Sequence, residues 1–323
     1  MKLLYIQSNI GWIFDYINQY IINALIRLNI NLKVVRLENE GKNILEIVKN
    51  FKPNIIFCIL GHGITATLIN QMKKFGAKTA CWYVDDPYTI DLTVNSAKYF
   101  DYVFTIDSNC VRYYMNSGCK KVFFVPLGVD ESVFYPIEVD DFYKSDICFV
   151  GSAFPNRIEL IDKIAPYIAT RKVRIIGQWW DRLKSYDMLR PYITGNIMNP
   201  YEIMKFYRGA KINLNIHRYY DCPILPFNKN RIEAYTPNNR TFEIAACNSF
   251  QLTDYRKDLD KFYEIGSEII VFKDERDLID KIEYYLSNPY ERERISYNSY
   301  LRTISKHTYV CRLSQILNVI KND

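Results

Sequence analysis

Histidine and closely paired cysteines are scarce in this sequence, which narrows the chemistry that it can support. Only three histidines occur among 323 residues, and no two of them are four positions apart. The eight cysteines include no C-x-x-C pair, and several stand in apolar, strand-like runs. A zinc site is therefore not expected, and we interpret the cysteines as buried free thiols in a reducing compartment.

Glycine-rich nucleotide fingerprints and long apolar runs are also missing. Neither G-x-G-x-x-G nor G-x-x-x-x-G-K-[ST] occurs, which argues against a dinucleotide-dependent dehydrogenase and a P-loop kinase. The first predicted strand runs instead into SNIGWIF, with a single glycine. The start MKLLYIQSNIGW is too short for a membrane span and has no small-residue cleavage site. These features predict a cytoplasmic protein without a transmembrane segment.

Basic residues exceed acidic ones without forming a block. The formal net charge is +6, which is too mild to indicate nucleic-acid binding but favours anionic small ligands such as nucleoside diphosphates. Tyrosine is abundant, with 27 residues. We interpret this mainly as compositional bias, and the alternative is a stacking surface for sugars or bases.

Short apolar runs alternate with helical patterns in two series along the chain. Such alternation predicts parallel sheets covered on both faces, which bind ligands at the carboxyl ends of their strands. Residues 126–145, with two prolines, a glycine and several acids, predict a linker. The second series includes a proline-rich loop at 219–238, a predicted helix at 256–264 and a helical tail from 289. The fold class is thus α/β, with two doubly wound domains.

Two predicted helix starts carry an arginine where a cation opposes the helix dipole. In FVGSAFPNRIEL, Gly151 and Ser152 follow a strand and Arg157 lies in the first turn of the next helix. Free N–H groups at a helix start suit phosphate. The plainer interpretation is that Asn156 caps the helix, with Glu159 completing a capping box.

The second such start is NNRTFEIAAC. Here Asn238 or Asn239 can cap the helix, and we expect Glu243 in its first turn. Capping leaves Arg240 unexplained, whereas an anion at the helix start would explain it. Glu243 is then suited to accept hydrogen bonds from vicinal hydroxyl groups.

Three further places are candidates at strand ends. NLNIHR ends a strand with His217 and Arg218, where a lone histidine is often structural but the arginine favours phosphate. CWYVDDPYT ends another with Asp85 and Asp86, which suit a general base or a solvated turn equally. His62 stands between two glycines in LGHGIT and suits either close approach of a ligand or a structural role.

The second half of the chain contains a series of motifs that, by their sequence and order, resemble those of the CgeB-type (spore-maturation-like) glycosyltransferases. The motifs are FVGSAFPNR, INLNIHR, NNRTFEIAACNSFQLTDY, EIIVFKDERDLIDKIEYYLSNPYERERI and HTYVCR; the first half resembles the family only in its pattern and in WYVDDP. The resemblance implies a GT-B fold, with two Rossmann-like domains facing across a cleft. It implies an N-terminal acceptor domain (1–140), a nucleotide-sugar donor domain (141–305) with a glycosyltransferase group 1 character, and a C-terminal helix (306–323) crossing back to the first domain.

The resemblance also implies roles for individual residues. Glu243 would hold the nucleotide ribose, and Arg240 would contact the pyrophosphate. No metal or other cofactor is expected, because basic residues and a helix dipole would stabilise the leaving diphosphate. The donor-binding residues expected are Gly151, Ser152, Arg157, His217, Arg218, Asn239, Arg240, Thr241 and Glu243.

One departure from the family pattern leaves the stereochemistry open. Retaining relatives carry a glutamate eight positions before the ribose-binding one, where this chain has Tyr235. If the enzyme inverts, His62, Asp85 and Asp86 are the candidate bases. The expected function is transfer of a sugar from a nucleotide-sugar donor to a protein or a cell-surface or spore-surface glycan. The alternatives are a nucleotide-sugar epimerase and a non-catalytic nucleotide- or glycan-binding protein.

Overall fold

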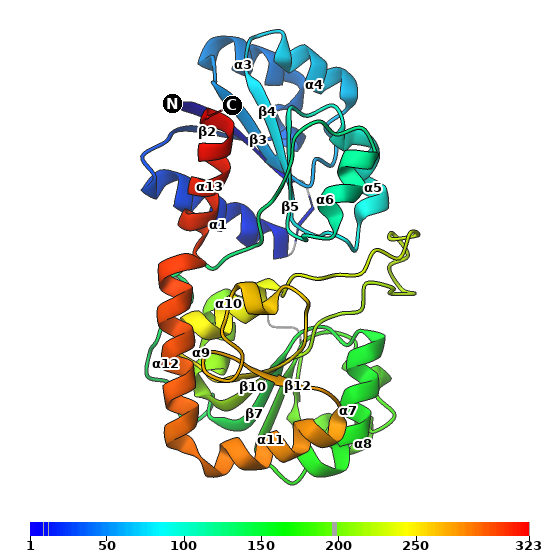
Figure 1. The fold of residues 1–323 in the computed structure, drawn as a ribbon, viewed down its shortest axis with the longest axis vertical. Helices are drawn as coiled ribbons and strands as arrows, with labels where there is room; N and C mark the ends of the chain where they lie inside the picture. Colours follow the sequence, from blue (N-terminus) through cyan, green and yellow to red (C-terminus); the bar gives the residue numbers. More distant parts are fainter. Residues whose placement is uncertain (9, 12, 196–198, 323) are drawn as a thin grey trace. The chain divides into compact units, whose positions relative to one another are not determined.

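Two compact units make up the chain in the computed structural model, which describes residues 1–8, 10–11, 13–195 and 199–322 (Figure 1). Each unit holds a six-stranded sheet whose strands all pair in parallel. The predicted pair of parallel-sheet α/β domains is thereby confirmed. Unit 1 comprises Met1–Leu127, Pro223–Thr236 and Tyr309–Asp323, and unit 2 comprises Gly128–Cys222 and Pro237–Thr308. In the segment SNIGWIF, which follows the first strand, Asn9 and Trp12 lie outside the described residues.

The sheet of unit 1 has the strand order β2-β1-β3-β4-β5-β6. Its strands are β1 (Lys2–Gln7), β2 (Asn31–Arg36), β3 (Ile55–Ile59), β4 (Lys78–Tyr83), β5 (Tyr102–Thr105) and β6 (Val122–Phe124). The helices are α1 (Ile13–Arg27), α2 (Leu37–Glu40), the 3-10 turn η1 (Gly41–Asn43), α3 (Ile44–Phe51), α4 (Ala66–Lys73), α5 (Ile90–Ala97), α6 (Cys110–Asn116) and α13 (Tyr309–Lys321).

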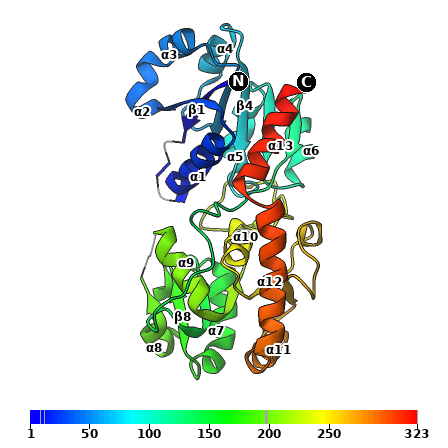
Figure 2. The same cartoon turned by 90° about the vertical axis from the view of Figure 1, so that its left-hand side faces the viewer.

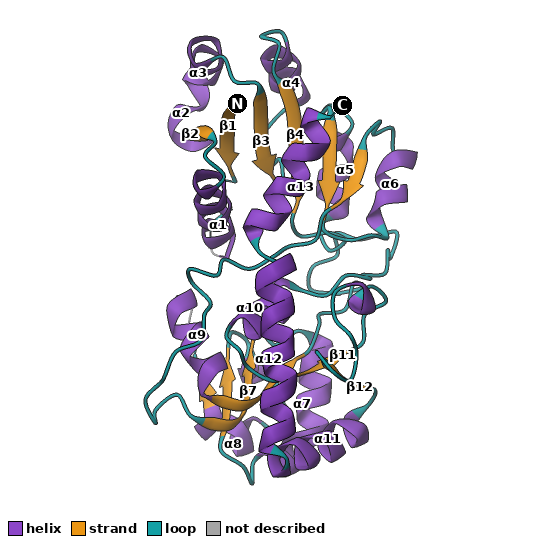
Figure 3. Cartoon of the chain, turned by 60° about the vertical axis from the view of Figure 1, so that its left-hand side comes forward, coloured by secondary structure: helices purple, strands orange, loops and turns teal. Residues whose placement is uncertain are grey.

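Helices cover both faces of this sheet (Figure 3). On one face, alternate strand residues such as Leu4 and Ile56 share a core with the buried residues of α3, α4, α5 and α6. On the other face lie α1 and α13, which contact each other. The Tyr309 ring of α13 lies 5.6 Å from the ring of Tyr20 and 6.2 Å from that of Trp82. The C-terminal helix is therefore a structural part of unit 1.

Residues Pro223–Thr236 also belong to unit 1, although we expected them in the donor domain. Hydrogen bonds explain the assignment. The buried Asp107 carboxylate accepts the backbone N–H groups of Tyr235 at 2.8 Å and Thr236 at 3.0 Å. The Asp91 carboxylate accepts the Lys229 N–H at 2.8 Å. The loop is thus anchored to unit 1 at its middle and at its C-terminal end.

The sheet of unit 2 has the strand order β12-β11-β10-β7-β8-β9. Its strands are β7 (Ser145–Val150), β8 (Val173–Ile176), β9 (Ile193–Thr194), β10 (Ala210–Asn215), β11 (Gln251–Asp254) and β12 (Ile270–Phe272). Its helices are α7 (Pro155–Ile168), α8 (Tyr186–Leu189), α9 (Pro200–Gly209), α10 (Asn239–Ala246), α11 (Glu275–Ser287) and α12 (Pro289–Lys306), with 3-10 turns η2 (Trp180–Arg182), η3 (Arg190–Tyr192) and η4 (Leu259–Lys261).

Different helices cover the two faces of the second sheet. Residues Phe149, Leu214 and Leu252 share a core with α7 and α11. α10 follows β10 in the chain and contacts α12, as Figure 2 also shows. His307 ends α12 as its C-cap. Its ring Nε2 lies 3.1 Å from the Phe262 carbonyl, so this histidine has a structural position in unit 2.

One predicted helix is absent, and one helix of the structure was not predicted. The expected helix at 256–264 is only the turn η4, because Leu259, Phe262 and Tyr263 are buried at helical spacing without forming a helix. The helix α5 was not predicted. Its sequence IDLTVNSA contains residues with low helix propensity, and packing of Ile90 and Ala97 into the core of unit 1 compensates for this.

We expect Asp107→Ala to lower the free energy of unfolding by roughly 1–3 kcal/mol, because it strips acceptors from two loop N–H groups. Urea unfolding followed by circular dichroism measures this change. Asp141→Ala, which removes an exposed carboxylate paired with Lys144, is the control and should change stability much less. Equal effects of the two substitutions would contradict the anchoring role of Asp107.

Candidate functional site

The carboxyl edge of the second sheet brings several of the predicted residues together. Gly151 follows β7 and carries a backbone φ of +155°. A Cβ atom on Gly151 would lie 3.1 Å from Nη1 of Arg157 and 3.2 Å from Nη2 of Arg240. Two guanidinium groups from different helices therefore flank the backbone of this loop.

A second glycine fixes the position of the Gly151 loop. A Cβ atom on Gly177 would lie 2.2 Å from the Gly151 carbonyl oxygen, so no side chain fits at position 177. The same carbonyl accepts the indole N–H of buried Trp180 at 3.0 Å. Trp180 thus braces the loop, while Trp179 is exposed and packs edge-on against Phe154.

The start of α10 carries Arg240 and the candidate ribose ligand. Asn238 is the N-cap, because its side chain accepts the Thr241 N–H at 3.0 Å. Arg240 is accordingly the second residue of the helix. Glu243 is the fifth, so the expectation that it lies in the first turn was wrong. Its carboxylate instead accepts a hydrogen bond at 2.5 Å from the Asn239 side chain.

A buried polar network holds this helix start against the sheet. The Asn215 amide nitrogen donates to Thr241 Oγ1 at 2.8 Å and to Gln251 Oε1 at 3.2 Å. The Asn215 amide oxygen accepts from the Asn238 side chain at 2.9 Å. Gln251 in turn donates to the Thr241 carbonyl at 2.9 Å. We did not identify Asn215 from the sequence, although asparagines alternating in the apolar run INLNIH were a signal.

Glu243 is an unusual carboxylate for its position. Its residue is 9% exposed, and burial raises its pKa to about 7, although Arg240 and the Asn239 side chain oppose the shift. Near neutral pH the group therefore lies close to its midpoint of ionisation. A ligand that donates hydrogen bonds would favour the ionised form.

Arg157 and Asn156 have structural partners. Arg157 is 4% exposed and donates to the carbonyls of Ile216 and Ser152, both at 2.9 Å. Asn156 does not cap its helix, because Phe154 is the N-cap and Asn156 donates to the His217 carbonyl at 2.8 Å. The capping-box interpretation was wrong for this helix, because the helix begins at Pro155, two residues earlier than an Asn156 cap requires.

His217 and Arg218 follow β10 at the same edge. His217 is buried, and its Nδ1 lies 2.7 Å from Oδ1 of Asp254. Burial lowers the pKa of His217, and Asp254 acts against this. Its Nε2 is buried without a hydrogen-bond partner among the described residues. The Arg218 guanidinium lies over the Phe154 ring, 5.2 Å from its centroid.

In unit 1, the three candidate bases have different surroundings. Asp86 is 2% exposed, and its carboxylate accepts from Thr105 at 2.6 Å and Tyr114 at 3.0 Å. Burial raises the pKa of Asp86 well above its usual value. His62 is half-buried; burial lowers its pKa, and the charge of Asp85 opposes this. Its Nδ1 is buried and has no hydrogen-bond partner within the described part of the chain.

The Asn215 network yields a stability prediction. Asn215→Ala removes a buried amide, and Gln251 Oε1 and Asn238 Nδ2 each lose a hydrogen bond. We expect the free energy of unfolding to fall by roughly 2–3 kcal/mol, measured by urea denaturation. The control Asn298→Ala removes a partly exposed side chain that donates to Ser267 and should cost about 1 kcal/mol or less. If Asn215→Ala lowered the free energy of unfolding no more than Asn298→Ala does, the structural role of the Asn215 network would be contradicted.

The raised pKa of Glu243 yields a pH prediction. The folded protein holds this proton more tightly than the unfolded chain, since the pKa rises from 4.5 to about 7. Ionisation of Glu243 therefore lowers the free energy of unfolding. This penalty has its full size above about pH 7 and disappears as the pH falls towards 4.5. At pH 8 the free energy of unfolding of Glu243→Gln should exceed that of wild type by up to roughly 3 kcal/mol. Thermal or urea unfolding measures this difference, which should vanish near pH 4. A difference independent of pH would contradict it.

Within the described residues, no helix combines the length and the apolar character that crossing a bilayer requires.

Comparison with known proteins places these features in a family. The family model described as "Glycosyl transferase-like" matches residues 157–318. Spore protein CgeB of Bacillus subtilis (strain 168) is 29% identical over 314 residues, which cover 96% of this chain and 95% of that protein.

Solved glycosyltransferase structures share the fold. A glycosyltransferase from Rickettsia africae superposes with a TM-score of 0.69 at 12% identity, covering 99% of this chain and 98% of that one. Anabaena Alr3699/HepE in complex with UDP-glucose gives a TM-score of 0.64 at 11% identity, with both chains fully covered. The GT-B fold and the CgeB-type resemblance are thus confirmed, and the chain belongs to the glycosyl transferase-like family.

Proposed function

We propose that this glycosyltransferase moves a sugar from a nucleotide-sugar donor to a protein or to a cell-surface or spore-surface glycan, without a metal ion. One observation carries the proposal: Arg240 and the start of α10 meet the Gly151 loop, and a buried carboxylate, Glu243, lies one helical turn further on. These groups offer cations and N–H donors to a diphosphate and an acceptor to hydroxyl groups.

The diphosphate would lie against the Gly151–Ser152 backbone, where a side chain on residue 151 would intrude on both guanidinium groups. Arg240 and the N–H groups of α10 would stabilise charge on the leaving diphosphate, which is the work that a metal ion does elsewhere. Arg157 would act as a positioning residue, since it donates to the carbonyls of Ser152 and Ile216. The HepE structures named with UDP and UDP-glucose support a donor of this class.

Glu243 would hold the ribose hydroxyl groups. Binding of those donors would favour the carboxylate form and shift its pKa down from about 7. His217 would complete the edge, with Nδ1 held by Asp254 and with a buried Nε2 that has no hydrogen-bond partner among the described residues. Arg218, Asn239 and Thr241 belong to the same proposed donor site.

For an inverting transfer, His62 is the best suited of the three candidate bases. Burial keeps its pKa low, so the imidazole is neutral at pH 7 and accepts a proton. Asp85 would influence the base through its charge. Asp86 is the least suited, because its carboxylate is buried and accepts from Thr105 and Tyr114.

All eight cysteines are free thiols, which favours a cytoplasmic, reducing location.

A nucleotide panel tests the donor site. We expect at least one of UDP, GDP, ADP and dTDP, at about 100 times its Kd, to raise the melting temperature by about 5 °C. Glu243→Ala and Arg240→Ala should each abolish most of this shift. Arg294→Ala, an exposed arginine on α12, should leave it intact. If none of the four nucleotides changed the melting temperature, the proposal would fail.

A further inference from the structure

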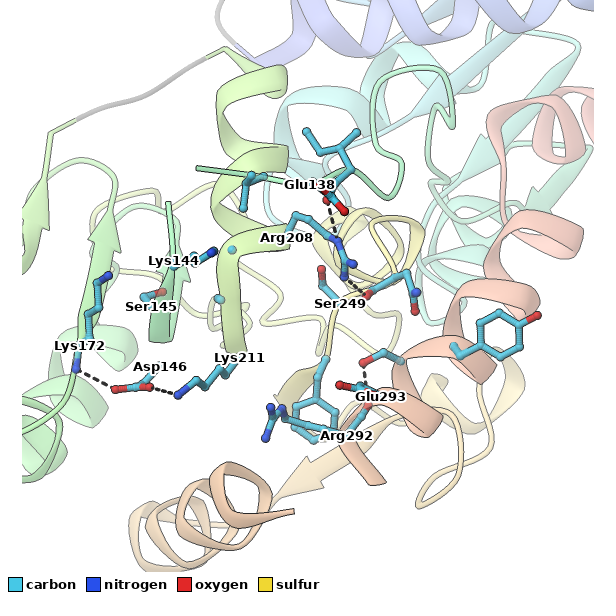
Figure 4. A pocket seen from close by; sticks show the side chains of 18 residues that line it. Glu138, Lys144, Ser145, Asp146, Lys172, Arg208, Lys211, Ser249, Arg292 and Glu293 are labelled. Atoms are coloured by element: carbon cyan, nitrogen blue, oxygen red, sulfur yellow. Dashed lines mark hydrogen bonds and ion pairs between the residues drawn. The ribbon is translucent and has the colours of Figure 1, made fainter. Parts of the chain in front are cut away.

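A cavity in unit 2 lies at the amino edge of the sheet, where β7 and β10 begin. Its volume is about 900 Å³, within the roughly 300–1,000 Å³ that small-molecule sites occupy. Figure 4 shows Ser145, Asp146, Lys211, Arg208 and Arg292 around this hollow. The residues of the proposed donor site follow the opposite, carboxyl ends of the same strands and do not line this cavity.

Two buried polar atoms in the cavity wall lack partners. Ser145, the first residue of β7, is 4% exposed. Neither its hydroxyl nor the side-chain oxygen of Asn248 has a hydrogen-bond partner among the described residues. Buried polar groups are nearly always hydrogen-bonded, so the Ser145 hydroxyl and the Asn248 side-chain oxygen leave hydrogen-bonding capacity unused at the wall of this cavity.

The charge of the wall favours an anion. Five lining residues are basic and three are acidic; they are Lys144, Lys172, Arg208, Lys211 and Arg292, and Glu138, Asp146 and Glu293. Partial burial lowers the pKa of Arg292, although the charges of Glu293 and Asp146 oppose this. A desolvated guanidinium of this kind gains from an anionic partner.

Arg208 fixes the geometry of the wall. Its Nη1 donates to the Asn248 carbonyl at 3.0 Å, and its Nε donates to the Ile137 carbonyl at 2.9 Å. These bonds join the end of α9, the turn after α10 and the segment that precedes β7. Lys211 Nζ lies 2.8 Å from Asp146 Oδ1. The cavity is therefore held by contacts from several elements.

We propose that this cavity binds a small anion that carries hydroxyl groups, with the chemistry of a sugar phosphate. The phosphate would pair with Arg292 and Lys211, and the hydroxyl groups would bond to Ser145 and Asn248. This site is separate from the donor site and does not depend on the proposed transfer reaction.

The test is calorimetric titration of the full chain with glucose 6-phosphate, and separately with glucose and with inorganic phosphate. We expect glucose 6-phosphate to bind with a Kd below about 1 mM, and each partial ligand to bind at least about tenfold more weakly. Binding of inorganic phosphate as tight as that of glucose 6-phosphate would overturn the role of the hydroxyl groups. Absence of binding by all three would overturn the site.

Variants locate the binding. Ser145→Ala and Arg292→Gln should each weaken glucose 6-phosphate binding at least about tenfold. Ser145→Ala should leave the melting temperature of the free protein unchanged, because it removes a hydroxyl that makes no bond. Arg294→Gln, an equal loss of charge on the same helix, should change nothing. Unchanged affinity in Ser145→Ala and Arg292→Gln would refute the assignment.

Glu243→Ala separates this site from the donor site. The substitution should remove stabilisation by a nucleoside diphosphate while glucose 6-phosphate still binds with wild-type affinity. Loss of glucose 6-phosphate binding in Glu243→Ala would mean that the ligand occupies the donor site, and would overturn the second site alone.

Discussion

The hydrogen bonds of Asn215 are the constraint on which the candidate site depends. One side chain at the end of β10 joins the N-cap of α10, the Thr241 hydroxyl and Gln251 of β11. A fully satisfied polar cluster of this kind specifies one arrangement, because any shift of the helix would leave buried groups unpaired. The position of Arg240 beside the Gly151 backbone follows from that arrangement.

Burial of charged groups at the candidate site costs free energy, and a charged, hydrogen-bonding ligand would offset this cost. Glu243 is buried with a raised pKa, and the Arg240 guanidinium lies so close to Gly151 that a Cβ atom there would be 3.2 Å from its Nη2. A protein optimised for stability alone would not bury an ionisable group at this point. Stability given up in this way is typical of sites prepared for a charged, hydrogen-bonding ligand.

The sequence was sufficient for the two parallel sheets, because their buried strands read as apolar runs between helical patterns. It failed where local pattern and tertiary packing disagree. Leu259, Phe262 and Tyr263 imitate a helical face although they belong to a turn, and α5 forms from weak helix formers because the core requires it. Arg240 and Glu243 were identified from the sequence because they are charged residues near a predicted helix start. Asn215 did not, because the role of a buried amide depends on partners such as Gln251, 36 positions away.

The place of α13 in unit 1 has a consequence for synthesis of the chain. Tyr309 packs between the rings of Tyr20 and Trp82, yet the ribosome adds it only after every residue of unit 2. Domains tend to fold as units during translation. The face of the first sheet that α1 covers therefore lacks its second helix until residues 309–321 have been synthesised, after every residue of unit 2. In this protein the domain that begins first is the one that finishes last.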